Sequence, residues 1–226
     1  MFMEFFRYEI RYNLARPVTW VYFGMMFLLG ALITSFAGGG FADINVSLGG
    51  MNSGGIVYVN AATPIAFATI LLTSLMGLGI ISALYSTSVQ RDFENNTHSL
   101  FYTSPISKAG YLGGRFAAVT VVVLVIMAGC SLGLLFPTLI PNFLKPEKVG
   151  PVNLAFYLHP LLVFTLPNIL FAGGLFFMVS SLTRKANVAN YLATFMLLGY
   201  LLASNLVRDV ENQTAASILD PFGLIT

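Results

Sequence analysis

Charged side chains and cysteine are both scarce in this sequence. Only 9% of its 226 residues are charged, whereas 57% are hydrophobic. So few polar side chains cannot cover the surface of a water-soluble globule, and lipid must therefore be the solvent for most of the chain. The single cysteine, Cys130, excludes an intrachain disulfide and any metal site built from several cysteines.

The hydrophobic residues gather in five stretches that are long enough to cross a membrane. A bilayer core roughly 30 Å thick takes about 20 apolar residues per helix. The sequence therefore predicts an all-α integral membrane protein with one transmembrane domain over residues 1–226. Pro167 lies inside the fourth stretch and predicts a kink around Asn168. The predicted spans are 17–36, 63–86, 115–136, 158–182 and 187–206.

Residues 2–15 are predicted to form an amphipathic helix before the first span. Glu4, Arg7 and Arg11 share one face of this helix, and such a helix lies in the membrane interface with its basic side toward anionic headgroups. Pro17 suits the first turn of the span that follows. The side chains of the predicted apolar face are Phe2, Phe6, Ile10 and Leu14.

Basic residues are distributed unevenly between the two predicted sides of the membrane, eight against three. Because lysine and arginine are enriched on the cytoplasmic side, the amino terminus and the loop 87–114 are predicted to be cytoplasmic. The richer side carries Arg7, Arg11, Arg16, Arg91, Lys108, Arg115, Arg184 and Lys185, and the other carries Lys145, Lys148 and Arg208.

The loop from Gln90 to Arg115 has two parts. In the first part, four residues at helical spacing give a short helix an apolar face, which indicates a partner that covers it. These residues are Phe93, Thr97, Leu100 and Phe101. In the second part, Pro105 ends that helix and Ser107 is expected to cap a new helix leading into the third span.

This loop resembles the signature of permeases of the ABC-2 type. In that family an Arg-acidic-x-Glu stretch precedes a threonine, a leucine-rich turn and Pro-Ile-Ser. A glycine usually stands before the threonine, where this chain has Asn96. The matching residues are Arg91, Asp92, Glu94, Thr97, Leu100, Pro105, Ile106 and Ser107.

The resemblance implies a multi-pass transporter subunit, not an enzyme, in the bacterial inner membrane. Its partners would be membrane lipid, a second permease half of the same or a different chain, and a separate ABC ATPase subunit, but not nucleic acid. No G-x-x-x-x-G-K-[ST] loop occurs here, so ATP and Mg would be bound by the ATPase and no cofactor by this chain. The residues implied to couple the permease to the ATPase are Arg91, Asp92, Phe93, Glu94, Thr97, Leu100, Phe101 and Pro105.

The segments RDFENNTHSLFYTSPISKAGYLGGRF and LDPFG are most similar to bacterial permeases that are fused, in longer chains, to a second permease half and a zinc aminopeptidase. Permease halves of this family have six spans, so we expect this chain to be an amino-terminal fragment that stops before the sixth. A membrane anchor for a fused aminopeptidase is one alternative function. The chain has no H-E-x-x-H, so that catalysis would lie elsewhere.

A second alternative is an intramembrane enzyme of the rhomboid type that uses Ser131 with His159. The segment 129–133 matches G-x-S-x-G, but it lies within an apolar helix, where small residues favour close helix packing. Asn168 and Asn190 are candidates for a substrate path, although polar residues in spans more often join helices.

Overall fold

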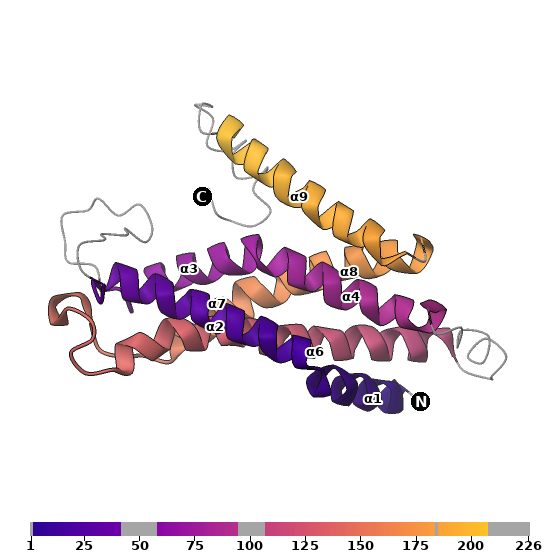
Figure 1. Ribbon diagram of the computed structural model, residues 1–226, viewed down its shortest axis with the longest axis horizontal. Helices are drawn as coiled ribbons and strands as arrows, with labels where there is room; N and C mark the ends of the chain where they lie inside the picture. The colour runs from indigo at the N-terminus through magenta and orange to yellow at the C-terminus, as the bar shows by residue number, and fades with distance from the viewer. Residues whose placement is uncertain (1, 42–57, 95–106, 184, 208–226) are drawn as a thin grey trace. The chain divides into compact units, whose positions relative to one another are not determined.

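A computed structural model describes residues 2–41, 58–94, 107–183 and 185–207 of the chain. All regular structure within these ranges is helical, and no strand occurs in them. The predicted all-α class is therefore confirmed for this part of the chain. Figure 1 labels the helices in chain order.

Three helical segments are long and apolar enough to cross a membrane. They are α2 (Pro17–Ala37), the segment Ala109–Leu139 that includes all but the first residue of α6 (Lys108–Leu135), and the segment Ala155–Thr183. The pair α3 (Ala62–Leu75) and α4 (Gly77–Glu94) would add a fourth span. The fifth predicted span coincides with α9 (Ala186–Val207), and its crossing of the membrane stays a prediction.

The second predicted span, 63–86, is not one straight helix. It breaks at Met76, where α3 and α4 meet at an angle of 46°. Gly77 and Gly79 follow the break, and the bond from the Ile80 amide to the Met76 carbonyl is long at 3.5 Å. Glycine has a low helix propensity, so these two residues let the helix bend.

The fourth predicted span contains a wide turn close to the expected kink. It is built from α7 (Ala155–Pro160), the π-helical turn η3 (Leu161–Thr165) and α8 (Leu166–Thr183). The ring of Pro167 would collide with the carbonyl of the residue four positions earlier in a regular helix. The π turn comes just before this proline, so the irregularity lies about one turn earlier than Asn168.

The amino-terminal helix α1 (Phe2–Ala15) has the predicted bounds, and its most buried residues are polar. These are Glu9 and Asn13, while Phe6, Ile10 and Leu14 of the predicted apolar face are half-buried and Phe2 is exposed. Arg7 and Arg11 are exposed, as expected for the basic face. Hydrophobicity does not predict that Glu9 and Asn13 are the most buried residues of this helix.

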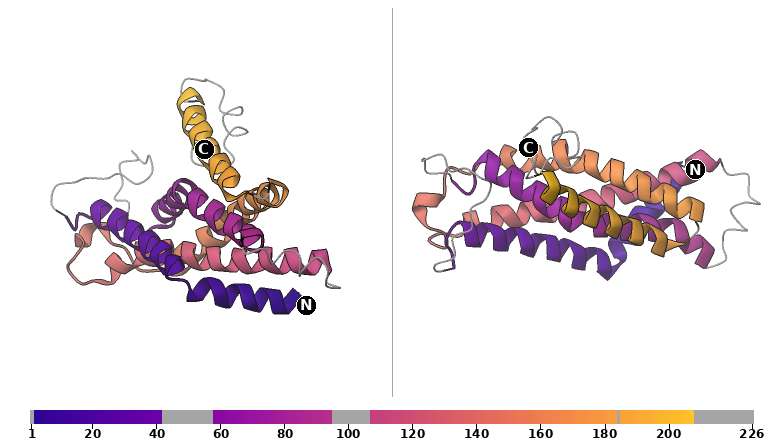
Figure 2. Two further views of the ribbon diagram at one scale, coloured as in Figure 1. Left: turned by 45° about the vertical axis from the view of Figure 1, so that its right-hand side comes forward. Right: turned by 90° about the horizontal axis from the view of Figure 1, so that it is seen from above.

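The chain divides into two compact units. The first comprises residues 1–19, 75–124 and 168–226, and the second comprises residues 20–74 and 125–167. In the first unit α4 lies against α9 (Figure 2), and its core contains Tyr85, Val119 and Phe176. The core of the second unit contains Met26, Ala68 and Met127.

Loop segments of the second unit are joined by specific hydrogen bonds. The Asn60 side chain donates to the Gly150 carbonyl at 2.6 Å and accepts from the Gly150 amide at 2.8 Å. The Lys148 ammonium donates to the carbonyl of Ala37 at the end of α2. Two short 3₁₀ turns, η1 (Phe136–Leu139) and η2 (Pro146–Lys148), lie in this region, where prolines prevent a longer helix.

Candidate functional site

The first residues of the predicted coupling segment form the last turn of α4. Arg91, Asp92, Phe93 and Glu94 belong to this turn. The other four predicted coupling residues, Thr97, Leu100, Phe101 and Pro105, lie outside the described residues. The chain reappears at Ser107, whose hydroxyl accepts a hydrogen bond from the Gly110 amide at 3.3 Å. Ser107 therefore caps α6 as predicted.

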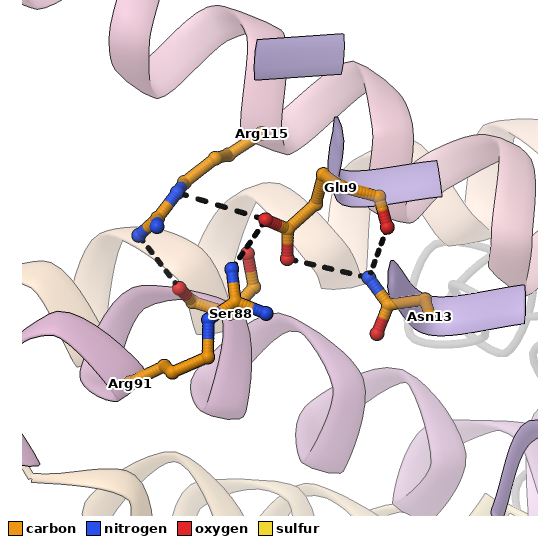
Figure 3. Close-up of polar contacts among 5 residues, drawn as sticks. All are labelled: Glu9, Asn13, Ser88, Arg91 and Arg115. Carbon is orange, nitrogen blue, oxygen red and sulfur yellow. Dashed lines mark hydrogen bonds and ion pairs between the residues drawn. The ribbon is translucent and has the colours of Figure 1, made fainter. Parts of the chain in front are cut away.

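Arg91 turns inward from the end of α4 and pairs with Glu9 of α1. Its Nη2 atom donates to Oε2 of Glu9 at 2.5 Å (Figure 3). The Glu9 side chain is only 1% exposed and that of Arg91 is 12% exposed. This is a charge-assisted hydrogen bond in a largely water-free place, where such bonds are stronger than at the surface.

Arg115 of α6 brings a third helix to the same carboxylate. Its Nε atom lies 3.8 Å from Oε2 of Glu9, and its Nη1 atom donates to the Ser88 carbonyl of α4 at 2.9 Å. One oxygen of Glu9 thus faces two guanidinium groups. The cluster of Glu9, Arg91 and Arg115 joins α1, α4 and α6, and we call it the ionic cluster.

Neutral side chains surround the ionic cluster and fix its geometry. Asn13 donates to Oε1 of Glu9 at 3.3 Å and to the Glu9 backbone carbonyl at 2.9 Å. The Arg91 guanidinium lies over the ring of Tyr12, 4.1 Å from its centroid, and that of Arg115 lies 4.7 Å from the centroid of Tyr111. These cation–π contacts replace part of the hydration that both arginines lose.

Glycines on α6 allow α1 to come close enough for this pairing. A Cβ atom at Gly114 would lie 2.9 Å from the Phe2 carbonyl oxygen and 3.1 Å from the Phe5 Cβ. Phe5 also meets Tyr111 edge to face, with ring centroids 5.2 Å apart. The contact between α1 and α6 is thus close and largely apolar, and Gly110 and Gly114 have the spacing of small residues that lets helices approach closely.

A second set of contacts joins α4 to α6 and α8 deeper in the first unit. The Tyr85 hydroxyl lies 2.7 Å from the Thr120 hydroxyl, and the Tyr85 ring contacts Phe116 and Phe177. Tyr85 is fully buried. Six residues of helix, roughly 9 Å, separate it from Arg91. The last part of α4 and the first part of α6 are therefore joined at two places, the ionic cluster and the contacts of Tyr85.

The two candidate substrate-path residues lie in different surroundings. Asn190 of α9 accepts a hydrogen bond from the Ser82 hydroxyl of α4 at 3.1 Å, which is a helix-to-helix contact. Asn168 of α8 is half-buried. A substrate role for either residue stays a prediction.

The segment around Ser131 serves helix packing. Cβ atoms at Gly129 and Gly133 would collide with the backbone of α2 at Phe23 and Phe27, so both glycines face α2. Ser131 itself is buried. These contacts support the packing interpretation of 129–133 over a nucleophile. Within the described residues, no group of three or more His, Cys, Asp and Glu side chains could hold a metal ion.

Sequence reasoning did not find Glu9, although it found both of its partners. Arg91 was singled out as a coupling residue and Arg115 as the end of the loop. Glu9 and Asn13 lie four residues apart on α1, the spacing of one helix face, but this spacing does not predict that a carboxylate is buried.

Comparisons with protein-family models, with curated proteins and with solved structures found no match for the chain.

Proposed function

We propose that this chain is the permease half of an ABC-2 type transporter that moves a substrate across the membrane with ATP hydrolysed by a separate subunit. The loop between α4 and α6 would dock on that ATPase subunit. A second permease half, of the same or a different chain, would complete the path, and the loop would face the cytoplasm of a bacterial cell.

One observation carries this proposal. Both helices that border the loop meet at a single buried carboxylate, Glu9, close to the points where the loop begins and ends. A docked subunit that moves the loop would pull on α4 and α6 together, and through Glu9 on α1. A coupling loop needs such a firm attachment, because an interface with two states transmits motion only through packed elements. The resemblance of residues 90–115 to the family signature points the same way.

The test is to purify the tagged native protein in mild detergent from its own membranes and identify the proteins that accompany it. We expect a subunit with a G-x-x-x-x-G-K-[ST] motif. Phe93→Asp places a charge on the predicted docking face and should reduce recovery of this subunit at least tenfold, since a buried unpaired charge is costly.

Ser131→Ala is the matched control, because it changes a buried side chain far from the loop in sequence and should leave the recovery unchanged. Leu100→Asp gives a second charge on the same face, and size-exclusion chromatography shows whether each variant is folded. Absence of any ATPase subunit from the wild-type sample would refute the proposal. Equal recovery with wild type and both folded aspartate variants would also contradict it.

A further inference from the structure

The contacts of α1 with α4 differ in kind from its contacts with α6. Toward α6, the helix presents Phe2 and Phe5 to Gly113, Gly114 and Tyr111. Toward α4, the contacts run through Arg91, which is paired with Glu9 and covered by the ring of Tyr12. α1 is thus joined to α6 mainly by apolar packing, with the longer ion pair between Glu9 and Arg115 beside it, and to α4 by the ion pair between Glu9 and Arg91.

The guanidinium groups of Arg91 and Arg115 both lie beside the Glu9 carboxylate. The Arg115 and Glu9 side chains are 4% and 1% exposed. Without the negative charge, two positive groups would remain close together in a place with little water. Like charges repel strongly there, because the dielectric screening of water is lost.

About six residues before Arg91, Tyr85 holds α4 to α6 independently of the ionic cluster. The bonds of Tyr85 with Thr120 and its ring contacts with Phe116 hold α4 to α6 without any charged group. The bond from Ser82 to Asn190 holds α4 to α9 further along. The start of the α4 segment between Tyr85 and Glu94 is therefore held by uncharged contacts, and its end is held by the ion pair of Arg91 with Glu9.

From these contacts we propose that Glu9 is a positioning residue that holds the end of α4 against α1 and α6 as a releasable latch. Loss of the Glu9 charge releases the last two turns of α4 from α1 and α6. The packing of α1 on α6 and the contacts of Tyr85 with Thr120 and Phe116 are kept. A role of this latch in coupling the chain to an ATPase subunit rests on the proposed function. The holding of α4 by Glu9 does not rest on it.

Amide hydrogen exchange of the full chain in lipid nanodiscs, followed by mass spectrometry, tests the latch. Glu9→Gln keeps the size of the side chain and removes its charge. We expect exchange in residues 86–94 to become roughly tenfold faster or more, which is the effect of losing a charge-assisted hydrogen bond. Exchange in residues 116–124 of α6 should change little.

Two further variants separate a latch from a general structural role. Glu147→Gln removes an exposed carboxylate of the second unit and should leave exchange as in the wild type. The exchanged pair Glu9→Arg with Arg91→Glu restores one acid among two bases and should restore protection of residues 86–94.

Unchanged exchange at the end of α4 in Glu9→Gln would overturn the proposal. Equal acceleration across α4, α6 and α8 would also overturn it, because that pattern means general destabilisation. No ATPase subunit takes part in this experiment, so its result is independent of the pull-down.

Discussion

At the residue scale, single atoms decide how closely the helices of the first unit approach. Gly173 of α8 lies against the ring of Tyr85, and a Cβ atom there would be 2.5 Å from its Cε2 and Cζ atoms. Its neighbour Gly174 has no atom within 4 Å of the same position. Two adjacent glycines in one helix thus have different roles, and only the first is required by packing.

Gly173→Ala should lower the stability of the purified protein by about 1–3 kcal/mol, because the Tyr85 ring is buried and has no room to move. Gly174→Ala is the matched control. It should be neutral or stabilise by up to about 1 kcal/mol, since alanine favours a helix more than glycine does. Thermal unfolding midpoints in one detergent measure both, and equal shifts for the two variants would show that the Tyr85 contact is not the reason.

A second prediction at the residue scale concerns the stability of variants at Arg91 in the ionic cluster. Arg91→Ala leaves the Glu9 carboxylate without its closest partner, and breaking a buried ion pair in this way costs roughly 3 kcal/mol or more. Arg91→Lys should recover only part of this loss, because an ammonium cannot reproduce both the bond to Glu9 and the planar contact with the Tyr12 ring. Unfolding midpoints of the two variants compared with wild type would give this order, and a lysine variant as stable as wild type would contradict it.

At the scale of elements, the second unit is joined by backbone contact between α2 and α6. Gly30 of α2 faces the Cys130 carbonyl, and Gly129 and Gly133 of α6 face the backbone at Phe23 and Phe27. The Thr34 hydroxyl adds a hydrogen bond to the Leu134 carbonyl at 3.1 Å. In lipid, where there is little hydrophobic gain from helix association, such close approach supplies the attraction.

Gly133→Ala should separate α2 from α6, because the new methyl group would meet the Phe27 backbone, which cannot rotate away as a side chain can. Gly24→Ala, on the same α2 helix, meets no atom within 4 Å and should be tolerated. The fraction of protein that stays monodisperse in size-exclusion chromatography after heating distinguishes the two. Similar losses for both variants would refute the proposed helix contact.

At the scale of the whole molecule, the two arginines of the ionic cluster bear on the orientation in the membrane. Arg91 and Arg115 are two of the eight basic residues on the richer side, and both are used inside the protein. Acidic residues contribute little to the positive-inside rule, so pairing with Glu9 does not cancel their effect on insertion. The predicted cytoplasmic position of the amino terminus therefore still rests on the same count.

Cysteine labelling in intact cells tests this orientation. Cys130 is fully buried, so the wild-type background should be low. An impermeant maleimide should label Glu147→Cys from outside, and should label Ala109→Cys only after the membrane is opened, because both positions are exposed but lie on opposite predicted sides. The reverse pattern would invert the topology and move the loop between α4 and α6 out of reach of a cytoplasmic ATPase.

The sequence by itself determined the helical class, the bounds of α1 and the start of α2. These features depend on local properties: long apolar stretches, a cap at Ser107 and prolines at helix ends. Periodicity and propensity act over a few residues, so they can be read without knowing what each helix touches. The close packing at Gly129 and Gly133 also follows from spacing, although the partner helix does not.

Only the tertiary structure decided that Glu9 of α1 is buried and where the second span bends. Glu9 is buried because Arg91 and Arg115, far away in sequence, balance its charge, and no local rule predicts that a carboxylate faces inward. The break at Met76 likewise could not be predicted from Gly77 and Gly79, since isolated glycines in a helix often cause no bend. Long-range contacts decided the burial of Glu9, because burying a charge is favourable only when its partner is already in place.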